Sequence, residues 1–369
     1  MSERVDAFVV CAPGLEQLVL DEVVKCGVRP ASATHGGVHC VVTWPQLWAL
    51  NLKSRMATRV LVRLARFRAD GFDTLEAGLA RIDWSAHLPV GGVTVSAASD
   101  AKSGLFHTGA IEERVAAHVR ETTGRGEGDQ ALLVRVQHDV VTVSLDSSGA
   151  PLHKRGYRGV AGKAPLRETL AAALIAASGW DARSPLVDPF CGSGTLLVEA
   201  ALKARRMAPG RHRQFQFMSW PSFDDAAWQR LLKGADADVI DRCPPLLGSD
   251  RDAGAIDATL DNAASAGVEG SLEVVRRSVS ELVLPKGRPG WVVTNPPYGA
   301  RVGGESGTDL RDLFARFGAV LASQGRGWHV AVLASRETPV AQMHLPLTPS
   351  MSFSNGGIDV AVHTGSVPA

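Results

Sequence analysis

The chain has 369 residues, of which 45% are hydrophobic, 6% aromatic and 21% charged. This length is more than one hydrophobic core comfortably serves, so two or three globular domains are expected, and the composition excludes a disordered, collagen-like or coiled-coil protein. The 39 basic and 38 acidic residues give a net charge of +1. That balance excludes a uniformly basic nucleic-acid-binding surface but leaves room for local basic patches.

Short strands interleaved with helices are predicted for the first 150 residues. The strand patterns are Val5–Cys11, His39–Thr43, Arg59–Phe67, Gly92–Ser99, Leu132–Gln137 and Val140–Asp146, and the helical patterns are Gly14–Cys26, Pro45–Ala57, Asp73–Leu79 and Gly109–Thr122. The order predicts two small α+β units, over residues 1–68 and 69–150.

Residues 151–165 are rich in glycine, proline and basic residues, which is typical of a connector. After it, buried strands alternate with helices. The predicted strands are Leu186–Phe190, Leu246–Asp250, Leu272–Arg276, Trp291–Asn295 and Trp328–Ala334, and the helices are Ser193–Arg205, Asp252–Ala266 and Asp309–Ser323. This alternation predicts an α/β domain over residues 166–369 with a doubly wound, mostly parallel sheet.

Basic residues concentrate in three windows that contain no acidic residue: residues 23–69, residues 147–167, and the stretch that follows Glu199. Such clustering is what binding to a phosphate backbone requires, because each contact releases condensed counterions only where the backbone passes. Each window alone could equally be a solvated surface. Three of them in a nearly neutral chain favour nucleic acid as a partner.

The sequence gives no sign of a membrane, of export or of a metal. Its apolar runs are too short to span a bilayer, and the N-terminus lacks the apolar block of a signal peptide. The five cysteines and eleven histidines show no metal-ligand spacing. We therefore expect a cytoplasmic protein without a metal or a membrane partner.

A glycine-containing loop, Asp188-Pro-Phe-Cys-Gly-Ser-Gly-Thr195, joins the first predicted buried strand of this domain to a helix. Gly192 and Gly194 would let a ligand approach the backbone at the helix N-terminus, where free N–H groups attract an anionic group. The next strand ends at Asp250, whose carboxylate could accept hydrogen bonds from ribose hydroxyls. Loop and acid together indicate a nucleoside with an anionic group, and S-adenosylmethionine fits this description.

Asn295-Pro-Pro-Tyr298 follows the fourth predicted strand and is the most specific signal in the chain. The amino group of an aromatic base is a poor nucleophile, since its lone pair is delocalised into the ring. The side-chain oxygen of Asn295 and the carbonyl of Pro296 could accept its two hydrogens and direct the lone pair at a methyl group. Pro297 stiffens the turn, and Tyr298 could stack on a flipped base.

These motifs resemble those of class I S-adenosylmethionine-dependent methyltransferases that act on exocyclic amines. With residues 152–158 and 164–171, they resemble more closely the THUMP-domain RNA guanine-N2 methyltransferases, and the similarity begins near residues 12–18, as in the bacterial 23S rRNA branch. The resemblance implies a ferredoxin-like segment over residues 1–68, a THUMP RNA-binding domain over residues 69–150 and a Rossmann-like methyltransferase domain over residues 166–369.

The resemblance also implies roles for individual residues. The cofactor-binding set would be Pro165, Thr169, Asp188, Phe190, Gly192, Gly194, Thr195, Asp250, Arg251 and Ser278. Ser278 departs from the family, whose members usually carry an acid near the adenine at this position. Lys154, Arg155 and Arg158 of the connector would bind RNA.

The sequence thus predicts direct methyl transfer from S-adenosylmethionine to N2 of a guanosine in ribosomal RNA. A tRNA guanine-N2 methyltransferase acting near the acceptor stem shares the same motifs and stays open as an alternative. Two further classes are a protein-glutamine methyltransferase, which shares Asn-Pro-Pro-Tyr but has no use for a basic N-terminal half, and a non-catalytic RNA-binding factor.

Overall fold

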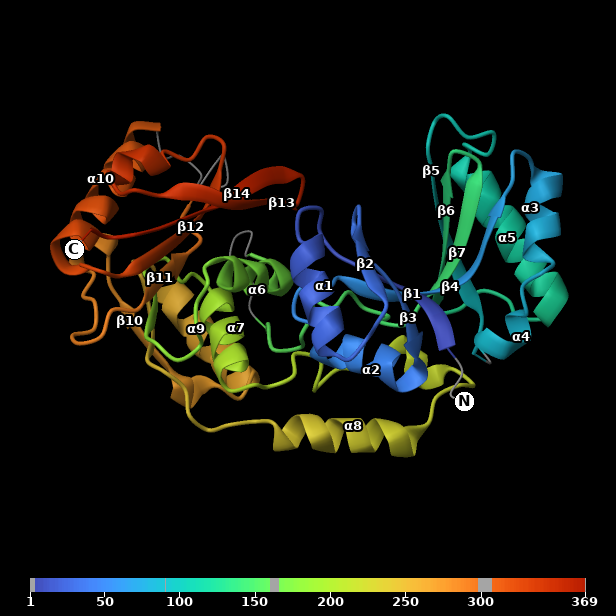
Figure 1. The fold of residues 1–369 in the computed structure, drawn as a ribbon, viewed down its shortest axis with the longest axis horizontal. Coiled ribbons are helices and arrows are strands. Elements are labelled where there is room, and N and C mark those ends of the chain that lie inside the picture. Colours follow the sequence, from blue (N-terminus) through green and yellow to red (C-terminus); the bar gives the residue numbers. More distant parts are fainter. Residues whose placement is uncertain (1–3, 90, 160–165, 298–306, 369) are drawn as a thin grey trace. The chain divides into compact units, whose positions relative to one another are not determined.

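The computed structural model describes residues 4–89, 91–159, 166–297 and 307–368, and they form two compact units (Figure 1). The first unit contains the described residues within 1–11, 19–152 and 213–233, and the second contains those within 12–18, 153–212 and 234–369. Within the described ranges, no helix has the length and apolar character needed to cross a membrane.

The first unit is built on one seven-stranded sheet with the order β2-β3-β1-β4-β7-β6-β5. Its strands are β1 (Arg4–Val10), β2 (Ala31–Thr34), β3 (Gly37–Thr43), β4 (Arg59–Arg68), β5 (Val93–Ser99), β6 (Gln130–Gln137) and β7 (Val140–Asp146). β4 pairs with β1 on one side and with β7 on the other, both antiparallel. The two α+β units predicted from the sequence therefore share a continuous sheet.

Helices cover one face of this sheet, namely α1 (Glu16–Lys25), α2 (Trp44–Lys53), α3 (Phe72–Leu79), α4 (Trp84–His87) and α5 (Thr108–Thr123) (Figure 1). Ala7, Val62 and Leu145 lie side by side across β1, β4 and β7, and all three are buried. Alternate residues on the strands point to the opposite face, as the pleat of a sheet requires. Hydrophobic side chains on one face thus bury themselves beneath the helices.

Residues 213–233 belong to the first unit, although they lie between the first two strands of the second. This segment includes the 3₁₀ helix η1 (Gln216–Ser219) and the start of α8 (Asp225–Ala237). Phe217 stacks on Trp48 of α2, with 6.0 Å between ring centroids, and the indole N–H of Trp220 donates to Gln130 Oε1 at 2.6 Å. The predicted methyltransferase range of residues 166–369 is therefore interrupted by a segment that packs elsewhere.

The second unit confirms the expected Rossmann-like α/β architecture. Its sheet has the order β10-β9-β8-β11-β12-β14-β13, and the first five strands are parallel. The strands are β8 (Leu186–Asp188), β9 (Leu246–Asp250), β10 (Leu272–Arg276), β11 (Trp291–Thr294), β12 (His329–Ser335), β13 (Thr348–Asn355) and β14 (Ile358–Ser366), and the main helices are α6 (Glu168–Ala177), α7 (Thr195–Ala204), α9 (Ala253–Ser265) and α10 (Gly307–Gln324).

Two features of this unit differ from the sequence-based expectation. β10 lies at the edge of the sheet and is mostly exposed, whereas its apolar composition had predicted a buried strand. The antiparallel hairpin of β13 and β14, which ends the sheet at its other edge, was not predicted. The strand order places β8 between β9 and β11, so the loops after these three strands meet at one end of the sheet, where ligands of such sheets bind.

Candidate active site

The glycine loop between β8 and α7 has the backbone conformation that its glycines allow. Gly192 and Gly194 have φ angles of +53° and +77°, in the left-handed region that disfavours other residues. A Cβ on Gly194 would come within 2.5 Å of the Thr259 side chain, whereas a Cβ on Gly192 would meet no atom within 4 Å. Gly194 is therefore needed for packing against α9, and Gly192 borders open space into which a ligand could approach.

Two polar side chains of α9 donate hydrogen bonds to backbone carbonyls of this loop. The Thr259 hydroxyl donates to the carbonyl of Gly192 at 2.8 Å, and the Asn262 amide donates to the carbonyl of Ser193 at 2.9 Å. Both side chains are buried, so their hydrogen bonds lie in a poorly solvated environment. Neither residue was predicted from the sequence. The available signal was two polar residues, three apart, on the otherwise apolar buried side of this helix.

Asp250 lies at the end of β9, next to the glycine loop. Its carboxylate accepts the N–H of Gly192 at 3.0 Å through one oxygen and the N–H of Asp252 at 3.0 Å through the other. A carboxylate has about four lone-pair positions, so each oxygen of Asp250 can still accept a hydrogen bond from a hydroxyl. Asp250 is thus positioned by the loop itself, which suits the predicted contact with ribose hydroxyls.

Asp188, at the end of β8, connects the glycine loop to β11. Its Oδ1 accepts hydrogen bonds from the Phe190 N–H at 3.2 Å and from the Thr294 hydroxyl at 2.6 Å. Burial raises the pKa of Asp188 to about 7, although both hydrogen bonds oppose the shift and the charge of Asp250 adds to it. Phe190 also packs edge-on against Phe317 of α10, with 5.4 Å between ring centroids. Asp188 therefore links the glycine loop to the end of β11 through its hydrogen bonds.

Asn295 directly follows Thr294 at the end of β11. Its Oδ1 atom is buried and has no hydrogen-bond partner among the residues that the structure describes. A buried acceptor without a partner is unfavourable by about 1–3 kcal/mol, so such an atom indicates a ligand that donates to it. Pro296 is buried and Pro297 is partly exposed. Tyr298, the last residue of the predicted catalytic motif, lies outside the described residues.

Thr169, near the start of α6, is a second buried group of this kind. Its hydroxyl has no hydrogen-bond partner among the described residues.

Arg158 connects α6 to the N-terminus of α7. Its Nη2 donates to the Leu166 carbonyl at 2.8 Å and to Thr195 Oγ1 at 2.9 Å, and its Nε lies 3.3 Å from Glu168 Oε1. Burial raises the pKa of Glu168, and the charge of Arg158 opposes that rise. Pro165 falls outside the described residues.

Arg251 and Ser278 lie at the rim of the same end of the sheet. Arg251 is exposed, immediately after Asp250. The Arg277 N–H donates to the Asp250 carbonyl at 2.8 Å, which places the next residue, Ser278, beside the end of β9. The Ser278 hydroxyl is 2.6 Å from that of Ser280, and its N–H donates to Glu281 Oε2 at 3.2 Å. Ser278 is thus near the site, with a hydroxyl where the family resemblance led us to expect an acid.

The three connector residues expected to bind RNA lie in different environments. Lys154 is exposed, but Arg155 is only 4% exposed and its Nε lies 3.3 Å from Glu199 Oε1, which also accepts the Tyr157 hydroxyl at 3.2 Å. Arg158 binds within the site, to Glu168 and Thr195. Arg155 and Arg158 thus belong to internal ion pairs, because Glu199 and Glu168 of neighbouring helices offset their charges. Of the three, Lys154 retains the exposure that an RNA contact needs.

We expect Arg155→Ala to lower the free energy of unfolding by about 3–5 kcal/mol, since it leaves the Glu199 carboxylate buried without its cation. Chemical denaturation measures this change. Lys154→Ala is the matched control, because it removes one positive charge from the adjacent exposed position and should change stability by less than about 0.5 kcal/mol. Equal stability of the two variants would contradict the structural role of Arg155.

Gly194→Ala should abolish measurable cofactor binding, because the new Cβ meets Thr259 and the left-handed backbone is strained. Isothermal titration calorimetry measures the affinity. Gly179→Ala is the control: Gly179 has a similar φ of +71°, but a Cβ added there would meet no atom within 4 Å, and it is not in the glycine loop. Wild-type affinity in Gly194→Ala would show that the loop tolerates a side chain and does not bind the cofactor closely.

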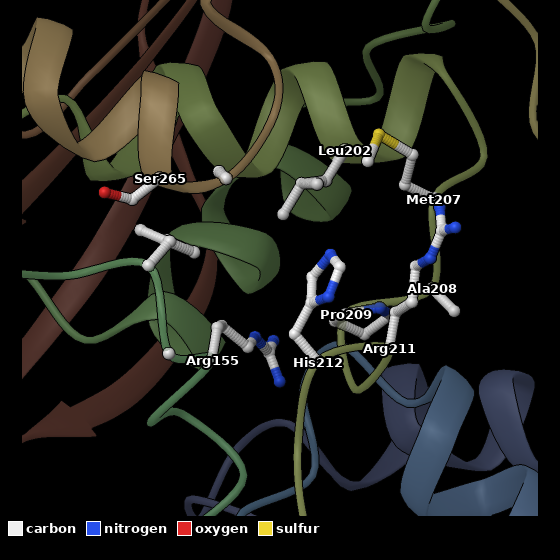
Figure 2. Close-up of a pocket in the computed structure, with 11 residues that line it drawn as sticks. Arg155, Leu202, Met207, Ala208, Pro209, Arg211, His212 and Ser265 are labelled. Atoms are coloured by element: carbon white, nitrogen blue, oxygen red, sulfur yellow. The ribbon is translucent and has the colours of Figure 1, made fainter.

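A cavity of about 100 Å³ lies elsewhere in the second unit (Figure 2). It is lined by the C-terminal ends of α7 and α9, by residues 207–212 and by the connector, with Arg155, Arg211 and His212 among its polar residues. Helix C-terminal ends lie at the opposite edge of a parallel sheet from the loops that follow its strands. This cavity is therefore separate from the candidate active site.

Comparison with known proteins gives matches in both units. Residues 155–361 match the family model of the RMKL-like methyltransferase domain, and residues 6–61 match that of the RlmL ferredoxin-like domain. The chain is 37% identical to the ribosomal RNA large subunit methyltransferase K/L of Methylococcus capsulatus over 96% of its own length. It spans only 50% of that relative.

Two further proteins match nearly end to end. A Synechocystis protein named as a candidate RNA methyltransferase, slr0064, is 32% identical over 95% of this chain and 94% of its own length. The crystal structure of SMU.472, a candidate methyltransferase bound to SAH, superposes with a TM-score of 0.90 at 26% identity and covers all of both chains. With the family model matching more than half of its residues, this chain belongs to the RMKL-like methyltransferase family.

Proposed function

We propose that this protein transfers a methyl group from S-adenosylmethionine to the exocyclic N2 of a guanosine in 23S ribosomal RNA. The observation that carries the proposal is the buried, unpartnered Oδ1 of Asn295 in the described structure, at the end of β11 and beside the glycine loop. The K/L relative supports large-subunit ribosomal RNA as the substrate class. With such a substrate, the protein would work in the cytoplasm.

The residues present fit S-adenosylmethionine, which supplies an electrophilic methyl group on a sulfonium. Thr169 Oγ1 is a buried polar atom without a partner in the described ranges, and Gly192 borders open space at the N-terminus of α7. We assign the glycine loop to the methionine carboxylate, since free N–H groups and the helix dipole favour an anion there. Asp250 would accept the ribose hydroxyls, and Ser278 would lie on the adenine side.

Asn295 and Pro296 would bind the target base. Once the base is flipped out of the RNA, its amino group can donate one hydrogen to Asn295 Oδ1 and the other to the Pro296 carbonyl. These two bonds hold the nitrogen with its lone pair directed at the methyl group, so positioning provides most of the rate enhancement. The nitrogen becomes acidic as it bonds to the methyl carbon, and no strongly basic residue is required to remove its proton.

The alternative is the tRNA branch, in which the same site would methylate a guanosine near the acceptor stem. Both substrates carry the same amino group, and the geometry of the site suits either. The match to the RlmL ferredoxin-like domain at residues 6–61 and the K/L relative favour the ribosomal assignment.

Nucleoside mass spectrometry of RNA from a deletion strain tests the proposal. Ribosomal RNA from the strain should lose one N2-methylguanosine per 23S molecule, and a plasmid copy of the wild-type gene should restore it, whereas a copy encoding Asn295→Ala should not. Loss from the tRNA pool alone would replace ribosomal RNA with tRNA as the substrate. Unchanged N2-methylguanosine in both pools, or loss of a different methylated nucleoside, would contradict the proposal.

A further inference from the structure

The sheet of the first unit has one face that its helices leave uncovered. The helices pack on the face that carries Ala7, Val62 and Leu145, and on β1 the side chains of alternate residues point the other way: Arg4 and Asp6 are exposed, and Phe8 is partly exposed. The same alternation is present on β6, where Leu133 is partly exposed and Arg135 is exposed. We call this second surface the open face.

A β-bulge in β4 gathers arginines on the open face. Arg63 pairs with Ser144 of β7, but the register shifts at Leu64, so that Arg66 pairs with Thr142. Without the bulge, positions 63 and 66 would point to opposite faces, because side chains alternate along a strand. With it, Arg63 and Arg66 share the open face, and Phe67 points to the helix face, where its ring lies against Gly78 of α3.

Arg135 of β6 completes the cluster. It also pairs with Thr142, from the other side of β7, so Arg66 and Arg135 flank this one residue on the open face. Both arginines are exposed, and neither forms an ion pair with any residue in the described part of the chain. Burial lowers the pKa of Arg63, the negative charge of Asp6 opposes this, and the positive charges of Arg66 and Arg135 lower the pKa further.

Asp6 and Asp146, which lie on this face, are each paired with a basic residue. Asp6 lies 2.9 Å from His39 Nε2, and Asp146 is buried against Arg59. The cluster of Arg63, Arg66 and Arg135 therefore carries a local excess of positive charge in a chain whose net charge is +1. An anionic partner would relieve the repulsion among its members, and phosphates are the anions that arginine pairs with most effectively.

The open face also carries apolar and aromatic surface between the cations. The guanidinium of Arg63 lies 4.4 Å from the centroid of the Phe8 ring, and Leu61 and Leu133 are partly exposed on the same face. A flat surface with an aromatic ring and arginines beside it suits unpaired bases, which stack on such groups while their phosphates contact the cations. A protein partner would have less use for three mutually repelling arginines.

We propose that the open face binds a single-stranded segment of the RNA substrate, with Arg66 and Arg135 on its phosphates and the Phe8–Arg63 pair stacked against a base. This inference rests on the proposed function for the identity of the partner. It adds a binding surface, in the first unit, to the methyl-transfer site of the second.

The test measures the salt dependence of RNA binding by the full chain. The probe is a fluorescently labelled single-stranded RNA of mixed sequence and about 12 nucleotides, titrated by anisotropy between about 50 and 200 mM salt. Arg66→Ala/Arg135→Ala should weaken binding by about tenfold and reduce the slope of log K against log salt by about 1.4, which is about 0.7 for each lost phosphate contact. Arg81→Ala/Arg120→Ala, which removes two exposed arginines elsewhere in the same unit, is the matched control and should bind as the wild type does.

Phe8→Leu separates stacking from charge. It keeps an apolar side chain but removes the ring, so affinity should fall by about fivefold or more with an unchanged salt slope. If Arg66→Ala/Arg135→Ala binds the RNA with wild-type affinity and slope, or if the control pair weakens binding equally, the open face is not the RNA surface. Methylation by the wild-type chain is measured in parallel. If the wild type methylates RNA but Arg66→Ala/Arg135→Ala does not weaken RNA binding, only this inference is refuted. If the wild type binds RNA through this face but does not methylate it, only the proposed function is refuted.

Discussion

Asn295→Ala should lower kcat for RNA methylation by about 10²–10³-fold, the effect of removing one preorganised hydrogen-bonding group from a reacting centre. The reason is the buried Oδ1 of Asn295, which has no partner in the described structure and is therefore available to the amino group of the base. Single-turnover methylation with saturating RNA measures the effect. The affinity for S-adenosylmethionine should stay within about twofold of wild type, since we assign Asn295 to the base and not to the cofactor.

Asn295→Asp is the matched variant for this prediction. It keeps an acceptor oxygen at the same position, so it should retain more activity than Asn295→Ala. A merely structural role for Asn295 would instead make the two variants equally active or equally unstable. If Asn295→Ala methylated RNA at the wild-type rate, the site would have been assigned to the wrong residues.

Asp188→Asn should remove the contribution of Asp188 to the pH dependence of stability between about pH 4 and pH 7. Burial raises the pKa of Asp188 to about 7 from its ordinary value of 3.8. A carboxyl whose folded-state pKa is raised favours folding in its protonated form, so the contribution of Asp188 to the free energy of unfolding falls as the pH rises through this window. A pKa shift of this size corresponds to a decrease of about 4 kcal/mol in the contribution of Asp188 to the free energy of unfolding, as an order of magnitude.

Asparagine resembles the protonated carboxyl, because it can accept the hydrogen bonds from Phe190 and Thr294 without carrying a charge. Urea denaturation of the wild type and of Asp188→Asn at several pH values from about 4 to about 8 measures the difference. Asp257→Asn, on an exposed position of α9, should keep the wild-type pH dependence. If Asp188→Asn showed the same pH dependence of stability as the wild type, Asp188 would not titrate in this window.

Elements with strong periodicity were predictable from the sequence. β9 and β10 have the bounds that were predicted for them, and the alternation of strands and helices after residue 166 correctly indicated a mostly parallel sheet. The shared sheet of the first unit was not predictable, since the pairing of β4 with β7 joins residues about eighty positions apart. The return of residues 213–233 to the first unit was also not predictable, because it depends on tertiary contacts such as the packing of Phe217 on Trp48 and the hydrogen bond from Trp220 to Gln130.

The candidate site could be recognised from motifs, but its supporting contacts could not. The glycine loop and Asp250 are brought together by the hydrogen bond from the Gly192 N–H, as the motif order suggests. Charge alone did not distinguish an RNA-facing arginine from an internal one: Arg155 is paired with Glu199, which is 44 residues away in the sequence. Similarly, Arg63 and Arg66 of β4 share a face only through the bulge at Leu64, which depends on pairing with β7.

Direct methyl transfer at Asn295 to the N2 of guanosine in ribosomal RNA is the central claim. The most direct test incubates the purified chain with unmethylated 23S RNA and S-adenosylmethionine that carries a deuterated methyl group, followed by nucleoside mass spectrometry. We predict deuterated N2-methylguanosine with the wild type and a loss of about 10²–10³-fold in its rate of formation with Asn295→Ala. Deuterium on another nucleoside, or equal labelling by both proteins, would contradict this claim.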